Sequence, residues 1–186
     1  MENILHLAEL KTKLQSCGAL RPEAWERIMQ LCQQTEVKTG ESFIRKQGTL
    51  AYIAQGLLKE YDAQHRTQPA IINFNGPKQS IITRKHNQSH YLKAANPSLV
   101  YYWDFEDLQK LYQEFKELKA IYDALIAEYD ELLLFRMHLL ELPVQKRIDT
   151  FRLIFKPMLP YLKKKDMANY LHLNYSFFVN QTNKRS

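Results

Sequence analysis

Three glycines spaced eight residues apart restrict the fold of this chain more than any other feature. Gly40, Gly48 and Gly56 separate short segments rich in β-branched and aromatic residues. Glycine adopts positive φ without steric cost, so this spacing is typical of turns between short antiparallel strands. We therefore expect an antiparallel β-roll (a double-stranded β-helix, or jelly roll) of about seventy residues. Its expected strands are 35–38, 42–46, 51–55, 57–62, 69–74, 79–84, 90–95 and 98–103.

Helices are expected on both sides of the β-roll, which makes the fold class α+β. Before it, an apolar stripe beginning at Leu5 predicts one helix, and Pro22 suits the first turn of a second helix. After it, Asp104 is placed as the N-cap of a long helix. The pair Leu142-Pro143 is expected to end or kink that helix.

The long helix is predicted to be apolar on two faces. Residues that are apolar except for Arg136 recur at alternating spacings of four and three from Leu118 to Leu139, as in a heptad seam. Ile121, Ile126 and Leu133 lie on the opposite side. A helix with two apolar faces needs two partners, and we expect the β-roll on one face and a second copy of the chain on the other. The residues assigned to this dimer helix are Leu118, Tyr122, Leu125, Tyr129, Leu132 and Leu139.

The excess of positive charge lies in the C-terminal part of the chain. From Arg136 onward there are ten Lys or Arg against three acids, while residues 1–135 carry a balance of −1. This asymmetry favours nucleic acid binding by the C-terminal part. A basic surface that is exposed to water and binds nothing is the alternative.

Composition excludes several classes of protein. A hydrophobic content of 45% and an aromatic content of 12% are too high for a disordered chain. Two cysteines are too few for a disulfide framework or a four-thiolate zinc site. No apolar run approaches the roughly 18–20 residues that span a bilayer. We expect a cytoplasmic protein with no membrane partner.

The order of these elements resembles the Crp/Fnr family of bacterial transcription regulators. The most specific match is the stretch from Lys38 to Lys59, with its Gly-Glu pair at Gly40-Glu41 and a second glycine, Gly48, eight residues on. The resemblance implies a sensor β-roll similar to a cyclic-nucleotide-binding domain, a dimer helix and a DNA-binding module. It divides the chain into residues 1–110, 111–141 and 142–186.

The stretch from Lys164 to Arg185 resembles the helix-turn-helix of that family, in a winged-helix-like module. Ala168 is the small residue where the two helices cross, and Asn174 with Ser176 can cap the second helix. Two departures stand out: His172 replaces the usual turn glycine, and Ser176 and Asn180 replace a Glu and an Arg of the recognition helix. The core is expected to contain Met167, Leu171, Leu173 and Phe178.

The resemblance implies double-stranded DNA as the partner of this module. Asn and Gln are natural partners of adenine, while Lys and Arg hold phosphates. The residues predicted to contact DNA are Lys163, Lys164, Lys165, Tyr175, Ser176, Asn180, Gln181, Asn183, Lys184 and Arg185.

The corresponding effector site departs from the family. In the family, a cyclic nucleotide is held by Gly-Glu and by an Arg before a small hydroxyl residue, and neither pattern occurs between Asn75 and Arg84. We therefore expect no cofactor and no cyclic AMP or cyclic GMP bound in the usual way, and an unknown small-molecule effector remains open. The candidate pocket residues are Gly76, Lys78, Gln79, Ser80 and Arg84.

Two other functions were weighed against a DNA-binding regulator. One is a ligand-binding or protein-interaction module whose DNA-reading helix has degenerated, which Ser176 and Asn180 suggest. The other is a cupin-type metal-dependent enzyme, which His65, His86 and His90 suggest. Metal-binding cupins need a His-x-His pair that is absent, so we expect exposed loop histidines, no metal site and no enzyme.

Overall fold

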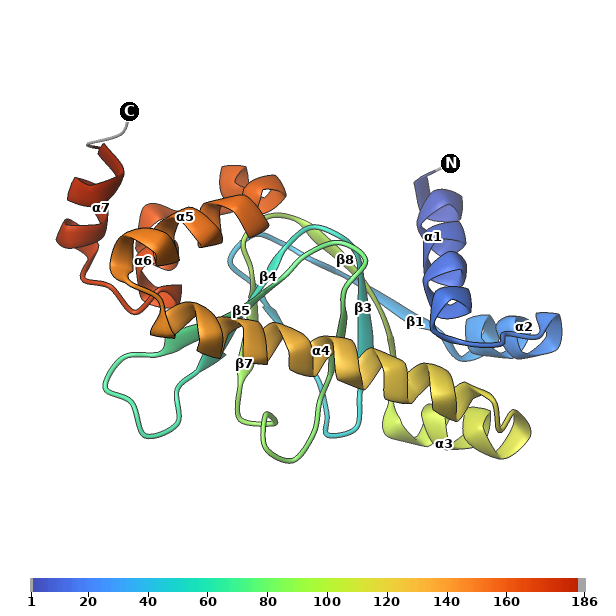
Figure 1. Cartoon of the computed structure of the whole chain (residues 1–186). Helices are drawn as coiled ribbons and strands as arrows, with labels where there is room; N and C mark the ends of the chain where they lie inside the picture. The colour runs from blue at the N-terminus through green and yellow to red at the C-terminus, as the bar shows by residue number, and fades with distance from the viewer. Residues whose placement is uncertain (1, 184–186) are drawn as a thin grey trace.

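Two four-stranded antiparallel sheets form the body of the protein (Figure 1). The structure is a computed structural model, and it describes residues 2–183. Every expected strand has an observed counterpart, which confirms the α+β class with antiparallel sheets. The first sheet has the order β1 (Gln33–Val37), β8 (Ser98–Trp103), β3 (Leu50–Gln55) and β6 (Ser80–Ile82). The second has the order β2 (Ser42–Phe43), β7 (Tyr91–Ala94), β4 (Leu58–Asp62) and β5 (Ala70–Asn75).

The three spaced glycines occupy turns, as predicted. Gly40, Gly48 and Gly56 all have positive φ, between 84° and 92°. At Gly56 a side chain is excluded for a second reason, because a Cβ would collide with the backbone of Pro97 and Ser98. Glycine is therefore required at all three positions for a positive φ, and at Gly56 also for the close approach of the neighbouring backbone.

Helices flank the two sheets. The N-terminal pair is α1 (Glu2–Cys17) and α2 (Pro22–Leu31), and β8 is followed by α3 (Phe105–Glu114) and α4 (Leu118–Glu141). The C-terminal group comprises α5 (Val144–Ile154), the 3₁₀ segment η1 (Lys156–Tyr161), α6 (Lys164–Tyr170) and α7 (Tyr175–Asn183). No helix among residues 2–183 is long and apolar enough to cross a membrane.

The single long helix expected after Trp103 is wrong in one respect. The chain leaves the helical conformation at Phe115, where φ is −136°, and resumes it at Leu118. Leu108 of α3 and Ile121 of α4, on either side of the break, belong to the same core. The expected helix 111–141 thus begins inside α3, and the division into three domains stays a prediction.

Two hydrophobic cores hold the molecule together. The first lies between the sheets and includes residues of α1 to α4. The second joins β4 and β5 to the C-terminal helices, with the rings of Phe74, Phe151, Phe155 and Tyr170 in contact at centroid distances of 4.8 to 6.0 Å. The C-terminal helices are therefore packed on the same chain's second sheet.

The residues assigned to the dimer helix lie mostly inside their own chain. Leu118, Leu125, Tyr129 and Leu139 are buried, and Tyr122 and Leu132 are half-buried. Residues of the heptad seam and Ile121 on the opposite side are both buried in their own chain, and the role of the seam in a dimer stays a prediction. Two other apolar residues of α4 are the exposed ones: Leu134 at 50% and Met137 at 60%.

Candidate functional site

The C-terminal helix pair α6–α7 has the predicted internal packing. Ala168, Leu171 and Phe178 are buried where the two helices meet. The Asn174 side chain caps α7, since its Oδ1 accepts hydrogen bonds from the backbone N–H groups of Ser176 and Phe177 at 2.9 and 3.3 Å. The capping role falls to Asn174, and the Ser176 side chain is left exposed.

The turn between α6 and α7 contains a non-glycine residue in the left-handed region. His172 has a φ of +56°, and it occupies the position where the Crp/Fnr helix-turn-helix usually has a glycine. An L-residue in this region costs about 1 kcal/mol or more, and here it persists because Leu171 before it and the capped helix after it are fixed by packing. The turn geometry is therefore kept without its usual residue.

The helix pair is attached to the edge of the second sheet. Asn169 of α6 behaves like one residue of an added strand: its Oδ1 accepts from Ile71 N at 2.6 Å, and its Nδ2 donates to Pro69 O at 3.0 Å. Lys59 of β4 forms an ion pair with Asp166 of α6 at 2.9 Å, with both side chains at most 15% exposed. Burial lowers the pKa of Lys59, but the hydrogen bonds and charges of Asp166 and Tyr61 together outweigh burial and raise it above its ordinary value.

Two arginines fix the helix pair relative to α4. Arg147 donates to Leu171 O at 3.0 Å and to Leu140 O at 2.7 Å, so it joins the ends of α6 and α4. Arg136 donates to Tyr170 O at 3.2 Å, and its guanidinium lies 5.2 Å from the centre of the Tyr170 ring. These side chains satisfy helix-end carbonyls that lack partners within their own helices. The basic C-terminal charge is thus partly structural.

The described residues predicted to contact DNA belong to α6, its N-cap and α7, and these two helices lie at one end of the molecule (Figure 1). Lys164 Nζ donates to Asn183 Oδ1 at 3.1 Å, which connects the start of α6 with the end of α7. Gln181 is half-buried, and Lys184 and Arg185 lie outside the described residues. The exposed members are Lys163, Lys164, Lys165, Tyr175, Ser176, Asn180 and Asn183.

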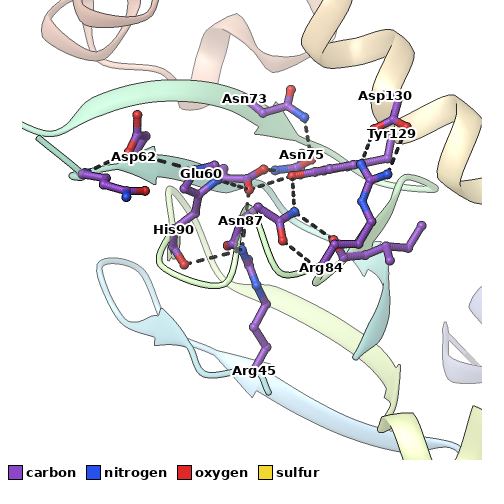
Figure 2. A network of polar contacts seen from close by, with 12 residues as sticks. Arg45, Glu60, Asp62, Asn73, Asn75, Arg84, Asn87, His90, Tyr129 and Asp130 are labelled. Carbon is purple, nitrogen blue, oxygen red and sulfur yellow. Dashed lines mark hydrogen bonds and ion pairs between the residues drawn. The ribbon is translucent and has the colours of Figure 1, made fainter. Parts of the chain in front are cut away.

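A second polar site lies between the sheets and α4. The Glu60 carboxylate is fully buried, and Figure 2 shows side chains of several strands and loops converging on it. Tyr129 Oη donates to Glu60 Oε1 at 2.7 Å, His90 Nδ1 lies 3.1 Å from the same oxygen, and Arg45 Nη2 lies 3.5 Å from it. The Arg45 side chain is only 4% exposed, and its Nε and Nη1 have no partner within residues 2–183.

The network continues from Glu60 along α4. Asn87 Nδ2 donates to Tyr129 Oη at 3.0 Å, and its Oδ1 accepts from Arg84 N at 2.7 Å. The Arg84 guanidinium forms a two-pronged ion pair with Asp130. Strands, the loop before β7 and α4 are therefore connected through polar side chains, of which the sequence pointed only to Arg84, His90 and Tyr129, and to each for another role.

Electrostatics in this network favour charged Glu60. Burial raises the pKa of Glu60, but the hydrogen bond from His90, the charge of Arg45 and the hydrogen bond from Tyr129 together bring it below its ordinary value. Burial also lowers the pKa of Arg45 and raises that of Tyr129. The side chains of this site are partners for one another.

The predicted effector residues do not form one pocket. Gly76, Lys78 and Gln79 belong to the turn after β5, which Gln79 closes by accepting from Gly76 N at 2.6 Å. Lys78 pairs with Glu9 of α1 at 2.8 Å, and Ser80 is buried at the start of β6. Arg84 is bound to Asp130 at the other end of β6. Arg84 is thus separated from the other four residues by β6, and an effector site formed by these five residues stays a prediction.

The three histidines are not alike. His65 and His86 are exposed, as predicted, whereas the side chain of His90, in the loop before β7, is largely buried against Glu60, which corrects the expectation that it is exposed. Residues 2–183 contain no group of three or more His, Cys, Asp or Glu side chains that could hold a metal ion.

Solved structures of transcription regulators are similar to this chain. FixK2 from Bradyrhizobium japonicum has a TM-score of 0.70 and 14% identity, over 82% of this chain and 83% of that chain. The chain has the fold of Crp/Fnr regulators. CLP from Xanthomonas campestris, a c-di-GMP-responsive regulator, has a TM-score of 0.66 and 16% identity, over 88% and 91%.

A Eubacterium rectale protein assigned to the Crp/Fnr family has a TM-score of 0.69 and 12% identity, over 89% of this chain and 83% of that chain. No protein-family model matches the sequence, and no curated protein matches it. At these identities the likeness concerns the fold, and the function has to be argued from the site.

Proposed function

We propose that this protein is a DNA-binding transcription regulator of the Crp/Fnr type and not an enzyme. In this proposal α6–α7 is the helix-turn-helix of a winged-helix-like module, and α7 enters the major groove. The observation that carries it is the exposed face of α7 beside three exposed lysines, Lys163 to Lys165, on a chain with the fold of Crp/Fnr regulators. The lysines would hold phosphates while α7 faces the bases.

The test is a gel shift of the full chain with duplex DNA over a range of salt concentrations. Each phosphate contact made by a cation contributes about 0.9 to the slope of log K against log salt. Replacing Lys163, Lys164 and Lys165 by Ala should reduce the slope by about two to three units and weaken binding to all sequences alike. Absence of any binding at about 50 mM salt would reject the proposal.

A matched control removes the same charge at the far end of the molecule. Lys110, Lys116 and Lys119 are exposed and lie in α3, at its end and at the start of α4, away from the helix pair (Figure 1). Their replacement by Ala should leave the salt slope within one unit of the wild-type value. An equal loss of slope in both triple variants would show that total charge, not the helix pair, attracts DNA.

We propose further that the protein acts as a homodimer through the outer side of α4. Leu134 and Met137 are large apolar side chains that the chain itself leaves half exposed or more. Replacing both by Glu should convert a dimer to a monomer in sedimentation experiments, whereas Glu replacement of Leu153, exposed at 72% on α5, should not. A wild-type monomer would overturn the dimer.

The two sheets, in the order of a jelly roll, are the proposed sensor domain. CLP is described as responsive to c-di-GMP, but this chain lacks the phosphate-binding pattern for cyclic AMP or GMP and buries Arg45 against Glu60 instead. A calorimetric titration should therefore show no binding of cyclic AMP at micromolar concentrations. Binding of cyclic AMP at micromolar or lower concentration would overturn this expectation and would mean that the two sheets open to admit the nucleotide.

A further inference from the structure

The outer face of α7 has an ordered arrangement of side chains. At about 100° per residue, Ser176, Asn180 and Asn183 fall on one line along the helix. Tyr175 lies on one side of this line and Phe177 on the other, with 51% and 43% of their surfaces exposed. The opposite side carries Phe178 and Thr182, which are buried. We call the five exposed residues the α7 stripe.

The α7 stripe contains hydrogen-bonding groups but no charge. None of the nine residues of α7 is Lys, Arg, Asp or Glu. Within residues 2–183, the Ser176 hydroxyl and the Asn180 carboxamide make no hydrogen bond, whereas Asn183 accepts one from Lys164. The free donors and acceptors therefore lie at the second and sixth of the nine residues of α7, within its first two turns, and the N-terminal part of a recognition helix is the part that reaches base edges.

The chemistry of this stripe suits one kind of base pair. A carboxamide makes two hydrogen bonds to the N6 and N7 atoms of adenine, and an aromatic ring packs against the methyl group of thymine. Guanine is usually read by Arg or Lys, which α7 lacks. The contact from Lys164 to Asn183 places a cation at the other end of the stripe, where the helix would leave the groove beside the phosphates.

We infer that the α7 stripe reads A·T base pairs in the major groove, with Asn180 as the adenine-reading residue and Phe177 as a contact to thymine methyl groups. This inference rests on the proposed function and specifies its target. The expected target is therefore an A·T-rich half-site, in place of the guanine-containing half-site that an Arg in the recognition helix would read.

The first experiment selects duplexes from a randomised pool with the full chain and sequences those that bind. The wild-type protein should enrich a half-site composed of A·T pairs. Asn180→Ala should lose about 5- to 150-fold in affinity for the selected site and retain its affinity for random DNA. Gln109→Ala, which removes an exposed carboxamide of α3 at the far end of the molecule from α7, should change affinity less than threefold (Figure 1).

A substitution with a new preference separates base reading from loss of folding. Asn180→Arg should move the preference at one position of the site from adenine to guanine. Its circular dichroism spectrum and unfolding midpoint should match those of the wild-type chain, because Asn180 is exposed.

The thymine contact has an independent test on the DNA side. Replacing thymidine by deoxyuridine in the selected duplex removes only the methyl groups. The wild-type chain should lose about fourfold in affinity per contacted methyl, and Phe177→Ala should bind both duplexes equally.

The outcomes distinguish the inference from the proposed function. Salt-dependent binding without enrichment of A·T pairs, or with Asn180→Ala indistinguishable from wild type, overturns the A·T reading and leaves DNA binding standing. A selected site rich in guanine overturns it as well. Failure to bind any duplex overturns both.

Discussion

The interior of the two-sheet body and the outer face of α7 handle polar side chains in opposite ways. In the body, Glu60 and Arg45 are buried, charged and paired with each other and with His90 and Tyr129. On the outer face of α7, the polar side chains are exposed and uncharged, and Asn180 has no partner within residues 2–183.

The difference follows from the cost of removing polar groups from water. A buried charge without a partner costs several kcal/mol, so the body has to complete its own network. An exposed carboxamide has no desolvation penalty in the unbound protein, because water satisfies its donors and acceptors. The body therefore uses its polar residues for cohesion between strands and α4, and α7 keeps its polar residues free for an external partner.

The variant with the largest expected effect on stability removes Glu60, the centre of the buried network. Glu60→Ala leaves Arg45 buried without its counter-charge, and we expect the free energy of unfolding to fall by about 3–5 kcal/mol. Urea denaturation followed by circular dichroism measures it.

Asp130→Ala is the matched control, because it removes another carboxylate paired with an arginine. The side chains of Asp130 and Arg84 are 42% and 28% exposed, so we expect a loss of only about 0–1 kcal/mol. Similar losses for the two variants would contradict the claim that Glu60 is the costly group to disturb.

A second test concerns the attachment of the helix pair to the body. Asn169→Ala removes both hydrogen bonds to the edge of β5 and leaves the Ile71 N–H without its partner. We expect a loss of about 1–3 kcal/mol in the free energy of unfolding, with faster hydrogen exchange at Ile71.

Asn180→Ala is the contrasting change on the exposed face, and it should alter the free energy of unfolding by less than about 0.5 kcal/mol. Equal destabilisation by the two Asn→Ala variants would remove the distinction between structural and free carboxamides.

The helix pair was more predictable than the buried network, for physical reasons. Ala168, Leu171 and Phe178 are local: their spacing within twenty residues fixes which side of each short helix is buried. The turn glycines are local as well, and Gly40, Gly48 and Gly56 behave as predicted.

The buried network depends on residues far apart in sequence. Strand alternation places Glu60 on the same side of β4 as buried Leu58, which was an available signal that a carboxylate faces the interior. Nothing local pairs it with Arg45, His90 or Tyr129, because those contacts need the assembled sheets and α4.

The side of α4 that faces the body was equally ambiguous in the sequence. Both sides are apolar, and both contribute buried residues to the same core, such as Leu125 of the heptad seam and Ile121 opposite it. The break at Phe115 has no sequence signal either, since Phe115, Lys116 and Glu117 are compatible with a continuous helix.

A third test uses pH to titrate the buried network. The pKa of Glu60 in the folded chain lies below the value of about 4.3 in an unfolded chain, so the unfolded chain binds the proton first as the pH falls. Stability from this group is complete above about pH 5 and is lost as the pH falls through the folded pKa, at about 1.4 kcal/mol per unit of lowering.

The measurement is the free energy of unfolding in urea between pH 7 and pH 3. Glu60→Gln should show a shallower decrease below pH 5 than the wild-type chain. If the free energies of unfolding of the two chains fell in parallel with pH, another carboxylate would dominate the acid destabilisation. Burial of Glu60 would then have no measurable effect on the pH dependence of stability.

The smallest expected effect on the free energy of unfolding comes from substitutions of His172, in the turn that joins α6 to α7. His172 holds φ at +56° without glycine, so His172→Gly relieves the strained backbone while it adds freedom to the unfolded chain. We expect a net gain of about 0.5–1 kcal/mol. His172→Ala keeps the strain and removes the ring, and it should give no gain. If His172→Ala stabilised the chain as much as His172→Gly, the imidazole rather than the backbone would be the source of the cost. DNA affinity should be the same for both variants, because α7 is positioned by its Asn174 cap and the burial of Phe178 and not by the turn side chain.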